Sequence, residues 1–505
     1  MKIESSVAFI SLSVGIFCHI SAGNFESARA IQIIKPENHS IQLELNDLKE
    51  ILEADDIRDR QVVVVSIAGA MRKGKSFLLN FFIRYLYAQY KTHDVTDWLG
   101  ENKSSNELVG FKWKIGKKPE TTGIWMWSDI FTHDYENGEK VAIIVLDTQG
   151  SFEKKSSMQD TSAIFALSLM LSSVQCYNIK EQIQEDSLQY LDLFTDYARA
   201  ALNQTNEKPF QYLLFIVRDW SFPYENSYGL NQQIVDELMA KNAEEMPETH
   251  QLRNRIQASF KKIGAFLMPH PGMIVAKSQN FTGHLQQIDT EFKQYLKVLV
   301  PLLFHPENVV IKSINGEKVR ARDLLQYLQA YVDIFKGGTL PATSTLIEAT
   351  AKASNTILLN DCLNLYVHSM QNAVNNVKPY FNQSNLLDAH GMAKDGSLTK
   401  FQQARKLGGE ELISVFQQRT ETAIEEQFLS FKEENERKRI DYIEKANLIN
   451  DKISMEIRMR FERKLLEKTD DESDIDTTEL NTLFATEKQN ALDEFDQRKM
   501  GENYH

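Results

Sequence analysis

The chain has 505 residues, enough for two or three domains of about 150 residues each. Apolar residues make up 42% and charged residues 25%, which excludes a wholly disordered chain. Its 22 glycines and 11 prolines are about half of the usual share, so long helices are favoured over a collagen-like or many-turned all-β chain. The net charge of −13, with no basic stripe, argues against nucleic acid as the main partner, and three cysteines without a CxxC pair give little support for a zinc site.

The first distinctive segment is an uncharged stretch at the amino terminus, residues 5–25. Its apolar core, residues 7–20, is only 14 residues long, whereas a bilayer span needs about 20. Lys2 precedes the core and small residues surround Ala22, as in a signal peptide with its cleavage site. We interpret residues 1–23 as a signal peptide or an uncleaved signal anchor, with a plain buried terminus as the remaining alternative.

Residues 31–312 alternate strand-like and helix-like segments, which predicts an α/β domain with a mostly parallel sheet. Three β-branched apolar runs begin at Gln61, Val141 and Tyr212, and each ends at a polar turn. Such runs are typical of central strands that are buried on both faces. Residues 161–179 are also uncharged, but their serines, threonine, glutamine and asparagine favour a half-buried helix.

The carboxyl-terminal part of the chain has a helical pattern. Residues 313–342 are predicted to be a linker, and residues 343–447 carry apolar residues at three- and four-residue spacing, interrupted at Gly408-Gly409. This pattern predicts an all-α helical bundle. Residues 448–505 are highly charged, with an acidic cluster at 470–476, and favour a solvated helix and a flexible tail without a transmembrane segment.

A phosphate-binding motif follows the first β-branched run. Residues 69–76, GAMRKGKS, match G-x-x-x-x-G-K-[ST] between a predicted strand and a predicted helix. The backbone N–H groups of such a loop approach phosphate oxygens, and the helix amino terminus adds positive potential. Lys75 would reach the β- and γ-phosphates, and Ser76 would hold Mg²⁺. The nucleotide-binding residues predicted in this segment are Gly69, Arg72, Lys73, Gly74, Lys75, Ser76 and Phe77.

Two further segments complete the predicted phosphate site. Asp147 and Gly150, in the sequence DTQG, follow the second β-branched run, where a carboxylate would orient Mg²⁺ and the Gly150 N–H would bond the γ-phosphate. Between this segment and the first lies Thr121, in the polar loop ETTG, whose hydroxyl would complete the Mg²⁺ shell and sense the γ-phosphate. The predicted metal ligands are therefore Ser76, Thr121 and Asp147.

Base recognition and charge stabilisation are assigned to other residues. No [NT]-K-x-D motif is present to read guanine, but Arg218-Asp219 ends the third β-branched run, where a carboxylate could accept from the guanine N1–H and amine. Position 151 is Ser and not the glutamine that positions water in Ras-like proteins. Arg72 lies inside the phosphate-binding loop, close enough to act as an arginine finger from the same chain. The predicted catalytic residues are Arg72, Lys75 and Thr121.

Together these segments resemble the atlastin branch of the dynamin-superfamily large GTPases, with the guanylate-binding proteins as a close neighbouring branch. The similarity extends over residues 31–445 and rests on GAMRKGKSFLLNFFIRYL, ETTGIWMWSDIF, VLDTQGSF, LFTDYARAAL, FIVRDWSFPYENSYG and MPHPG. The resemblance implies a guanine-nucleotide-binding G domain (31–312), a linker and a three-helix middle domain (343–447). It also implies a Mg²⁺-dependent GTPase with Arg72 as the finger and Arg218-Asp219 as the guanine reader, and a homodimer formed through the G domains and middle domains.

The ends of the chain depart from the family pattern. Atlastins carry two membrane segments after the middle domain, whereas here the corresponding region is charged. Membrane association would then depend on the amino-terminal segment. One hypothesis is a GTPase whose nucleotide cycle drives homodimerisation, tethering or remodelling endoplasmic reticulum membranes if that segment is an anchor. The alternative is a lumenal or secreted G-domain interaction protein without fusion activity. We expect the secretory pathway or endoplasmic reticulum as its location, with secretion or a cytosol-facing, membrane-associated G domain as alternatives.

Overall fold

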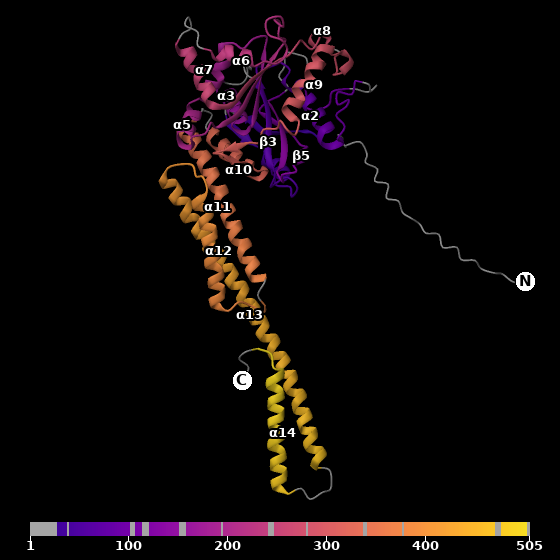
Figure 1. The fold of residues 1–505 in the computed structure, drawn as a ribbon, viewed down its shortest axis with the longest axis vertical. Helices are drawn as coiled ribbons and strands as arrows, with labels where there is room; N and C mark the ends of the chain where they lie inside the picture. Colours follow the sequence, from indigo (N-terminus) through magenta and orange to yellow (C-terminus); the bar gives the residue numbers. More distant parts are fainter. Residues whose placement is uncertain are drawn as a thin grey trace, which may run out of the picture. The chain divides into compact units, whose positions relative to one another are not determined.

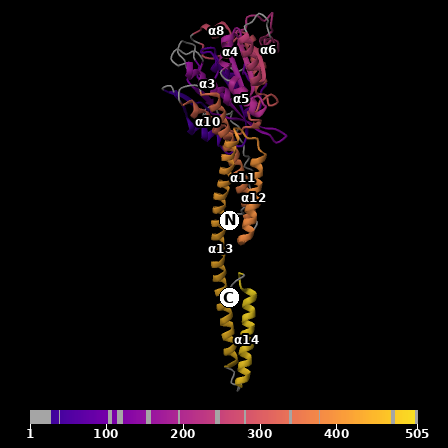
Figure 2. The same cartoon turned by 90° about the vertical axis from the view of Figure 1, so that its left-hand side faces the viewer.

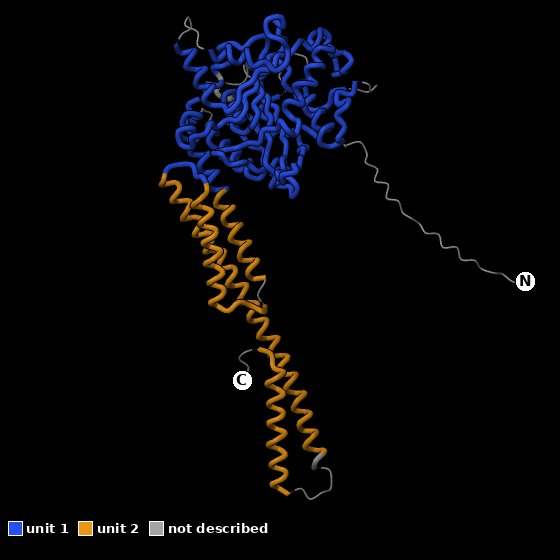
Figure 3. The backbone as a smooth tube through the Cα atoms, viewed as in Figure 1, with its two compact units in different colours: residues 1–357, 405–409 blue, residues 358–404, 410–505 orange. Residues whose placement is uncertain are grey.

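The computed structural model describes residues 28–37, 40–101, 107–113, 121–150, 158–192, 195–240, 247–278, 281–336, 341–375, 378–469 and 476–501. The predicted signal peptide or anchor and most of the predicted acidic cluster lie outside the described residues. The chain divides into two compact units (Figure 3). Unit 1 comprises residues 1–357 and 405–409, and unit 2 comprises residues 358–404 and 410–505.

Unit 1 is built on a ten-stranded mixed sheet with the order β2-β1-β4-β6-β3-β7-β8-β10-β9, and β5 pairs with β6. Neighbours in the series β6-β3-β7-β8-β10 are parallel, which confirms the predicted α/β class with a mostly parallel central sheet. The strands are β1 (Ala30–Glu37), β2 (Ser40–Leu43), β3 (Gln61–Gly69), β4 (Ile124–Trp127), β5 (Phe131–Asp134), β6 (Lys140–Thr148), β7 (Val174–Lys180), β8 (Phe210–Arg218), β9 (Gly229–Leu230) and β10 (Phe260–Leu267).

The three β-branched runs form the central strands β3, β6 and β8, as predicted. Side chains of a strand alternate between the two faces of the sheet, so a run without polar positions needs an apolar layer on each side. In β3, Val62 and Val64 join one core, and Val63 and Val65 join the other. All four are completely buried.

Helices cover both faces of this sheet (Figure 1). Side chains of α2 and α9 pack in one core, while those of α1, α3 and α10 pack in the other. The helices of unit 1 up to α9, including the π-helical turn η1 and the 3₁₀ turn η2, are α1 (Leu45–Leu52), α2 (Lys75–Tyr87), η1 (Ala88–Thr92), α3 (Met158–Leu171), α4 (Glu185–Asp192), α5 (Thr195–Thr205), α6 (Gln232–Met239), α7 (Pro247–Ser259), α8 (Met273–Lys277), η2 (Leu285–Gln287) and α9 (Thr290–Phe304).

The prediction of one half-buried helix over residues 161–179 was wrong. The segment contains the end of α3 and then β7, and both are buried. Its polar side chains are accommodated because they bond one another: Ser168 Oγ lies 2.7 Å from Ser66 Oγ and 2.9 Å from Gln175 Oε1. Buried polar groups are tolerated when they find such partners, so polar composition was a poor guide to exposure here.

Residues 313–342, which we expected to be a linker, contain regular structure that belongs to unit 1. They include β11 (Ser313–Ile314), β12 (Glu317–Lys318) and α10 (Ala321–Phe335). Leu324, Leu328 and Val332 of α10 follow helical spacing and are buried in the sheet core. The Val62 N–H also donates to Val319 O at 2.9 Å, which attaches this segment to β3.

Unit 2 is helical. It contains the end of α11 (Thr343–Asn375), then α12 (Gln383–Gln403), α13 (Glu410–Thr469) and α14 (Thr477–Arg498). Tyr366 and Met370 of α11, Leu386 of α12, and Ile424 and Phe428 of α13 share a core. The predicted interruption at Gly408-Gly409 is the connection between α12 and α13.

The helix α13 is 60 residues long and continues past residue 447, where we expected the middle domain to end. Its last part pairs with α14, which returns beside it (Figure 2). The described part of the predicted tail is therefore a helical hairpin. Within the described residues, no helix combines the length and the apolar composition needed to cross a membrane.

Candidate functional site

The phosphate-binding loop joins β3 to α2 and requires its glycines. Gly69 has φ 137°, and a Cβ there would lie 2.2 Å from Asn178 O on β7. Gly74 has φ 74° and caps α2, and its Cβ would lie 2.1 Å from Arg218 Nη1. The first helical bond of α2 runs from the Leu78 N–H to Gly74 O. The N–H groups of the first turn before Leu78 thus have no acceptor within the helix and form a site suited to an anion.

Lys75 lies at the start of α2 with its side chain folded into the loop. Its Nζ donates to Gly69 O at 3.2 Å and to Ala70 O at 3.3 Å. Burial lowers the pKa of Lys75 to about 8, while the nearby charge of Asp147 acts in the opposite direction. A phosphate bound in the loop would supply the negative charge that stabilises this ammonium group.

The three predicted metal ligands converge at the end of β6. Ser76 Oγ donates to Asp147 Oδ2 at 2.6 Å, and Thr121 Oγ1 donates to the same oxygen at 3.2 Å. The two hydroxyls are 3.3 Å apart. Burial raises the pKa of Asp147, opposed by the bond from Ser76 and by the charge of Lys75.

The same cluster fits a divalent cation. Asp147 Oδ1 is buried and accepts no hydrogen bond from any described residue. A carboxylate with two hydroxyl oxygens is an all-oxygen ligand set of the kind that Mg²⁺ prefers, together with substrate phosphates. The residues present therefore suit Mg²⁺.

Gly150 and the loop of Thr121 are held against the phosphate-binding loop. A Cβ on Gly150 would lie 2.4 Å from Met71 Cα, so only glycine allows this approach. The Gln149 N–H donates to Gly123 O at 2.8 Å, and the Gly123 N–H donates to Gln149 Oε1 at 2.9 Å. These two bonds join the Thr121 and Asp147 segments, and the approach of Gly150 to Met71 adds the phosphate-binding loop.

Arg218 and Asp219 end β8 beside the phosphate-binding loop. Arg218 is buried, and its Nη1 donates to Lys73 O. Burial lowers the pKa of Arg218, partly offset by the charge of Asp219. Asp219 has φ 57°, and its Oδ1 is buried but accepts no hydrogen bond from the described residues. Arg218 and Asp219 form an ion pair at 3.9 Å, but their side chains are only 11% and 16% exposed, so it is not an ordinary surface pair. Asp219 Oδ1, without a hydrogen bond, remains an oxygen acceptor beside the nucleotide loop.

The three remaining predicted loop residues, Arg72, Phe77 and Lys73, have side chains in different environments. Arg72 is exposed in the loop and has φ 61°. The Phe77 ring packs edge-on against Phe81 at 5.1 Å and Trp113 at 5.3 Å, so Phe77 can offer a nucleotide only its backbone. Lys73 contributes its carbonyl oxygen, the acceptor for Arg218.

Sequence reasoning missed Asn178. Its Nδ2 donates to Lys73 O at 3.0 Å, so it supports the loop from β7. Asn178 lies in the segment that we predicted to be a helix, and a strand assignment would have placed it at the same edge of the sheet as the loop.

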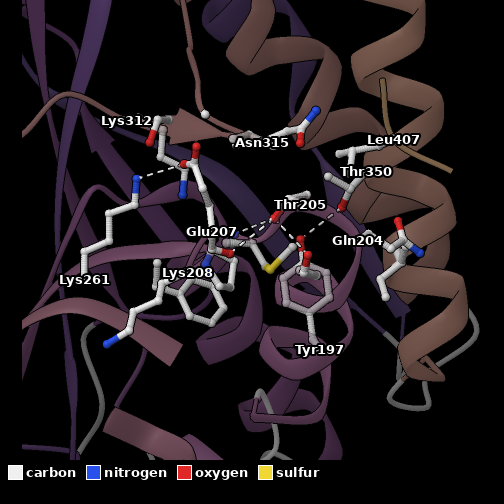
Figure 4. Close-up of a pocket in the computed structure, with 18 of the residues that line it drawn as sticks. Tyr197, Gln204, Thr205, Glu207, Lys208, Lys261, Lys312, Asn315, Thr350 and Leu407 are labelled. Atoms are coloured by element: carbon white, nitrogen blue, oxygen red, sulfur yellow. Dashed lines mark hydrogen bonds and ion pairs between the residues drawn. The ribbon is translucent and has the colours of Figure 1, made fainter. Parts of the chain in front are cut away.

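A separate small cavity lies at the other edge of the sheet, near the amino ends of β8 and β10 (Figure 4). Tyr197, Glu207, Lys261 and Lys312 are among its lining residues, and Lys261 pairs with Glu207 at 3.3 Å. Its volume of about 30 Å³ is room for about two waters. None of the predicted site residues lines it, so it is distinct from the phosphate site.

Comparison with known proteins agrees with this geometry. The family model "Guanylate-binding protein, N-terminal domain" matches residues 38–313. The chain is 48% identical to Atlastin of Drosophila melanogaster over 414 residues, covering 81% of this chain and 76% of that protein. It is 43% identical to Atlastin-2 of Xenopus laevis (83% and 73% covered) and 42% identical to human Atlastin-2 (82% and 70%). The chain belongs to the atlastin family. It is a GTP-binding large GTPase of the dynamin superfamily, which confirms the predicted family and the predicted hydrolysis of GTP.

Proposed function

We propose that this atlastin-family GTPase uses Ser76, Thr121 and Asp147 to hold the Mg²⁺ that accompanies GTP. The observation that carries the proposal is the convergence of both hydroxyls on Asp147 Oδ2 with Oδ1 left without a hydrogen bond. When bound, Mg²⁺ neutralises charge on the β- and γ-phosphate oxygens. The N–H groups at the start of α2 bind the phosphates, and Lys75 exchanges its two carbonyl partners for phosphate oxygens.

The geometry also supports a division of roles among the other residues. Arg72 is exposed on the loop and can turn toward the γ-phosphate to stabilise charge in the transition state. Gly150 supplies an N–H to the γ-phosphate from a loop already in contact with Met71. Arg218, held by Lys73 O, fixes the end of β8, and Asp219 accepts hydrogen bonds from the guanine N1–H and amine.

Nucleotide-dependent homodimerisation through the G domains and middle domains is part of the proposal, since family membership supports it. We also propose residence in the secretory pathway or at the endoplasmic reticulum, with membrane tethering if residues 1–23 are retained as an anchor. Mass measurement of the mature chain tests the topology: glycans and an amino terminus near Gly23 indicate a lumenal protein, and an unmodified chain that retains Met1 indicates a cytosol-facing G domain.

The catalytic assignment is tested with purified full-length chain. We expect GTP hydrolysis that needs Mg²⁺, and Arg72→Ala should lower kcat by about 10³-fold or more with little change in GTP affinity. Arg29→Ala is the matched control, because Arg29 is an exposed arginine of unit 1 paired with Asp47 away from the loop. Hydrolysis that is unchanged in the Arg72 variant would remove Arg72 from the mechanism while leaving the GTPase itself established.

A further inference from the structure

The carbonyl group of Lys73, inside the phosphate-binding loop, accepts hydrogen bonds from two side chains. Asn178 Nδ2 donates to Lys73 O at 3.0 Å, and Arg218 Nη1 donates to the same oxygen. The two donors come from neighbouring parallel strands, since Asn178 lies in β7 and Arg218 ends β8. A carbonyl oxygen has two lone pairs, so side chains from outside the loop occupy both of them.

The sheet fixes the position from which Asn178 reaches the loop. In the register of β3 and β7, Asn178 is the partner of Gly69, and its carbonyl oxygen would lie 2.2 Å from a Cβ at Gly69. On its other side β7 is hydrogen-bonded to β8, and Asn178 is the partner of Ile216 there. The residue is only 1% exposed. Its carboxamide therefore projects from a backbone position that is held on both sides.

Filling space in the sheet does not explain an asparagine at position 178. The Asn178 Oδ1 atom is buried but accepts no hydrogen bond from the described residues. A buried polar atom without a partner lowers stability. An apolar side chain of similar size, such as leucine, would fill the same space without that cost. The part of Asn178 that the protein uses is therefore the donor, Nδ2, and what it contacts is the loop.

The direction of the Lys73 carbonyl also sets the direction of the next N–H group. In a planar trans peptide the C=O and N–H bonds point in opposite directions. The Lys73 carbonyl points toward Asn178 and Arg218, so the Gly74 N–H of the same peptide points away from these two side chains. Gly74 is the cap residue of α2, at the helix end that is suited to an anion.

We propose that Asn178 is a positioning residue for nucleotide binding, whose bond to Lys73 O holds the Gly74 N–H in the direction of the α- and β-phosphates. Glycine-rich loops of this type hold those phosphates through backbone N–H groups. Because Gly74 has no Cβ, its peptide can rotate at little steric cost once Lys73 O loses one of its two donors. The proposal rests on GTP binding itself and uses neither the Mg²⁺ ligands nor Arg72.

Titration of the full chain with fluorescent analogues of GTP and GDP tests the proposal. Asn178→Ala should raise the dissociation constants of both nucleotides by about tenfold or more, because each complex loses a well-directed hydrogen bond to a charged phosphate. The kcat at saturating GTP should change by less than about threefold, since this bond is made equally in the ground state and in the transition state. Asn178→Asp keeps the size of the side chain but replaces the donor by an oxygen, so it should weaken binding at least as much.

Gln175→Ala is the matched control. Gln175 is an equally buried amide in the same strand, but its Oε1 accepts from Ser168 and Ser172 and not from the loop. This variant should lower the melting temperature while leaving both dissociation constants unchanged. Partial unfolding reduces the amplitude of a binding titration but not its midpoint, so a folding defect is distinguished from weaker binding by the remaining folded molecules.

Three results would overturn the proposal. The first is an unchanged dissociation constant for both nucleotides in the two Asn178 variants. The second is an equal rise in the Gln175 variant, which would make the effect a general property of β7. The third is a loss of kcat with normal binding, which would assign Asn178 to the chemical step. A natural chain that binds neither nucleotide would instead contradict the proposed function, so the two failures are distinguishable.

Discussion

Ser76 Oγ donates a 2.6 Å hydrogen bond to Asp147 Oδ2, although the residues are 71 positions apart in the sequence. The contact exists because β3 and β6 are parallel neighbours, so that the loops at their carboxyl ends meet. Thr121 reaches the same oxygen from the loop before β4, which pairs with β6 on its other side. The order of the strands thus assembles a site from three separate segments.

Replacement of Asp147 should weaken the binding of Mg²⁺ at this site. We expect Asp147→Asn to lower kcat for GTP by on the order of 10²–10³-fold, because the amide loses the negative charge that holds Mg²⁺. The fold should persist, since Ser76 and Thr121 can still donate to the amide oxygen. Mg²⁺ titration of GTP hydrolysis measures the effect. Asp134→Asn on β5 is the control, and a variant of Asp147 with normal Mg²⁺ dependence would contradict the assignment.

Replacing Gly74 should be costly for two reasons: its left-handed backbone conformation and the close approach of Arg218 to the place where a Cβ would lie. Gly74→Ala combines a left-handed backbone, which costs about 1–2 kcal/mol for a residue with a Cβ, with a clash against Arg218 Nη1. We expect a lower melting temperature and a loss of GTP binding, measured by thermal unfolding and by titration with a fluorescent GTP analogue.

Gly138 offers the matched control for this experiment. It has φ 86°, but a Cβ there would meet nothing within 4 Å. Gly138→Ala should therefore reduce stability by about 1 kcal/mol and leave GTP binding unchanged. If both variants bind GTP normally, the packing of Arg218 against the loop has no role in nucleotide binding.

The sequence predicted the structure correctly where a hydrophobic pattern is followed directly by a chemical motif. The run from Gln61 could only be a doubly buried strand, and the motif that ends at Ser76 required a loop and a helix after it. The sequence also indicated Arg218 and Asp219, but not that Arg218 is anchored to Lys73 O. Such a contact depends on β7 lying between β3 and β8, which no single segment reveals.

The sequence did not predict the burial of segments whose polar side chains hydrogen-bond to residues distant in the chain. Ser168 and Gln175 contributed to the prediction of a half-buried helix, although each bonds a partner inside the core. The linker prediction failed for a related reason, because α10 is amphipathic but the elements it covers, α1, α3, β2 and β3, lie far earlier in the chain. Local periodicity predicts a helix there, but only the tertiary structure shows what it covers.

Burial of Lys312 should make the free energy of unfolding depend on pH. Its Nζ donates to Ser172 O at 2.9 Å, and burial lowers its pKa to about 7 from the usual 10.5. Between these two values the unfolded chain binds the proton and the folded chain does not, so the Lys312 contribution to the free energy of unfolding rises with pH. Below about pH 7, the folded state must bury the charged form.

Lys312→Met isolates this contribution. The stability of the variant relative to the natural chain should be greatest near pH 6 and fall by about 2–3 kcal/mol by pH 9. Chemical denaturation of the full chain at several pH values measures the difference. Lys277→Met, at an exposed position on α8, should show no such trend. A pH-independent difference for Lys312→Met would mean that Lys312 is not buried in its charged form at low pH.

Asn450 should hold the end of α14 against α13. Its side chain is completely buried, its Nδ2 donates to Met500 O at 2.9 Å, and its Oδ1 accepts from the Met500 N–H at 2.7 Å. Asn450→Ala removes both bonds and should reduce stability of the hairpin by about 1–3 kcal/mol, because two backbone groups lose their partners. We expect faster hydrogen exchange along α14, whereas Asn447→Ala, one turn earlier and exposed, should leave it unchanged. Equal protection in both variants would show that the apolar seam alone holds α14 in place.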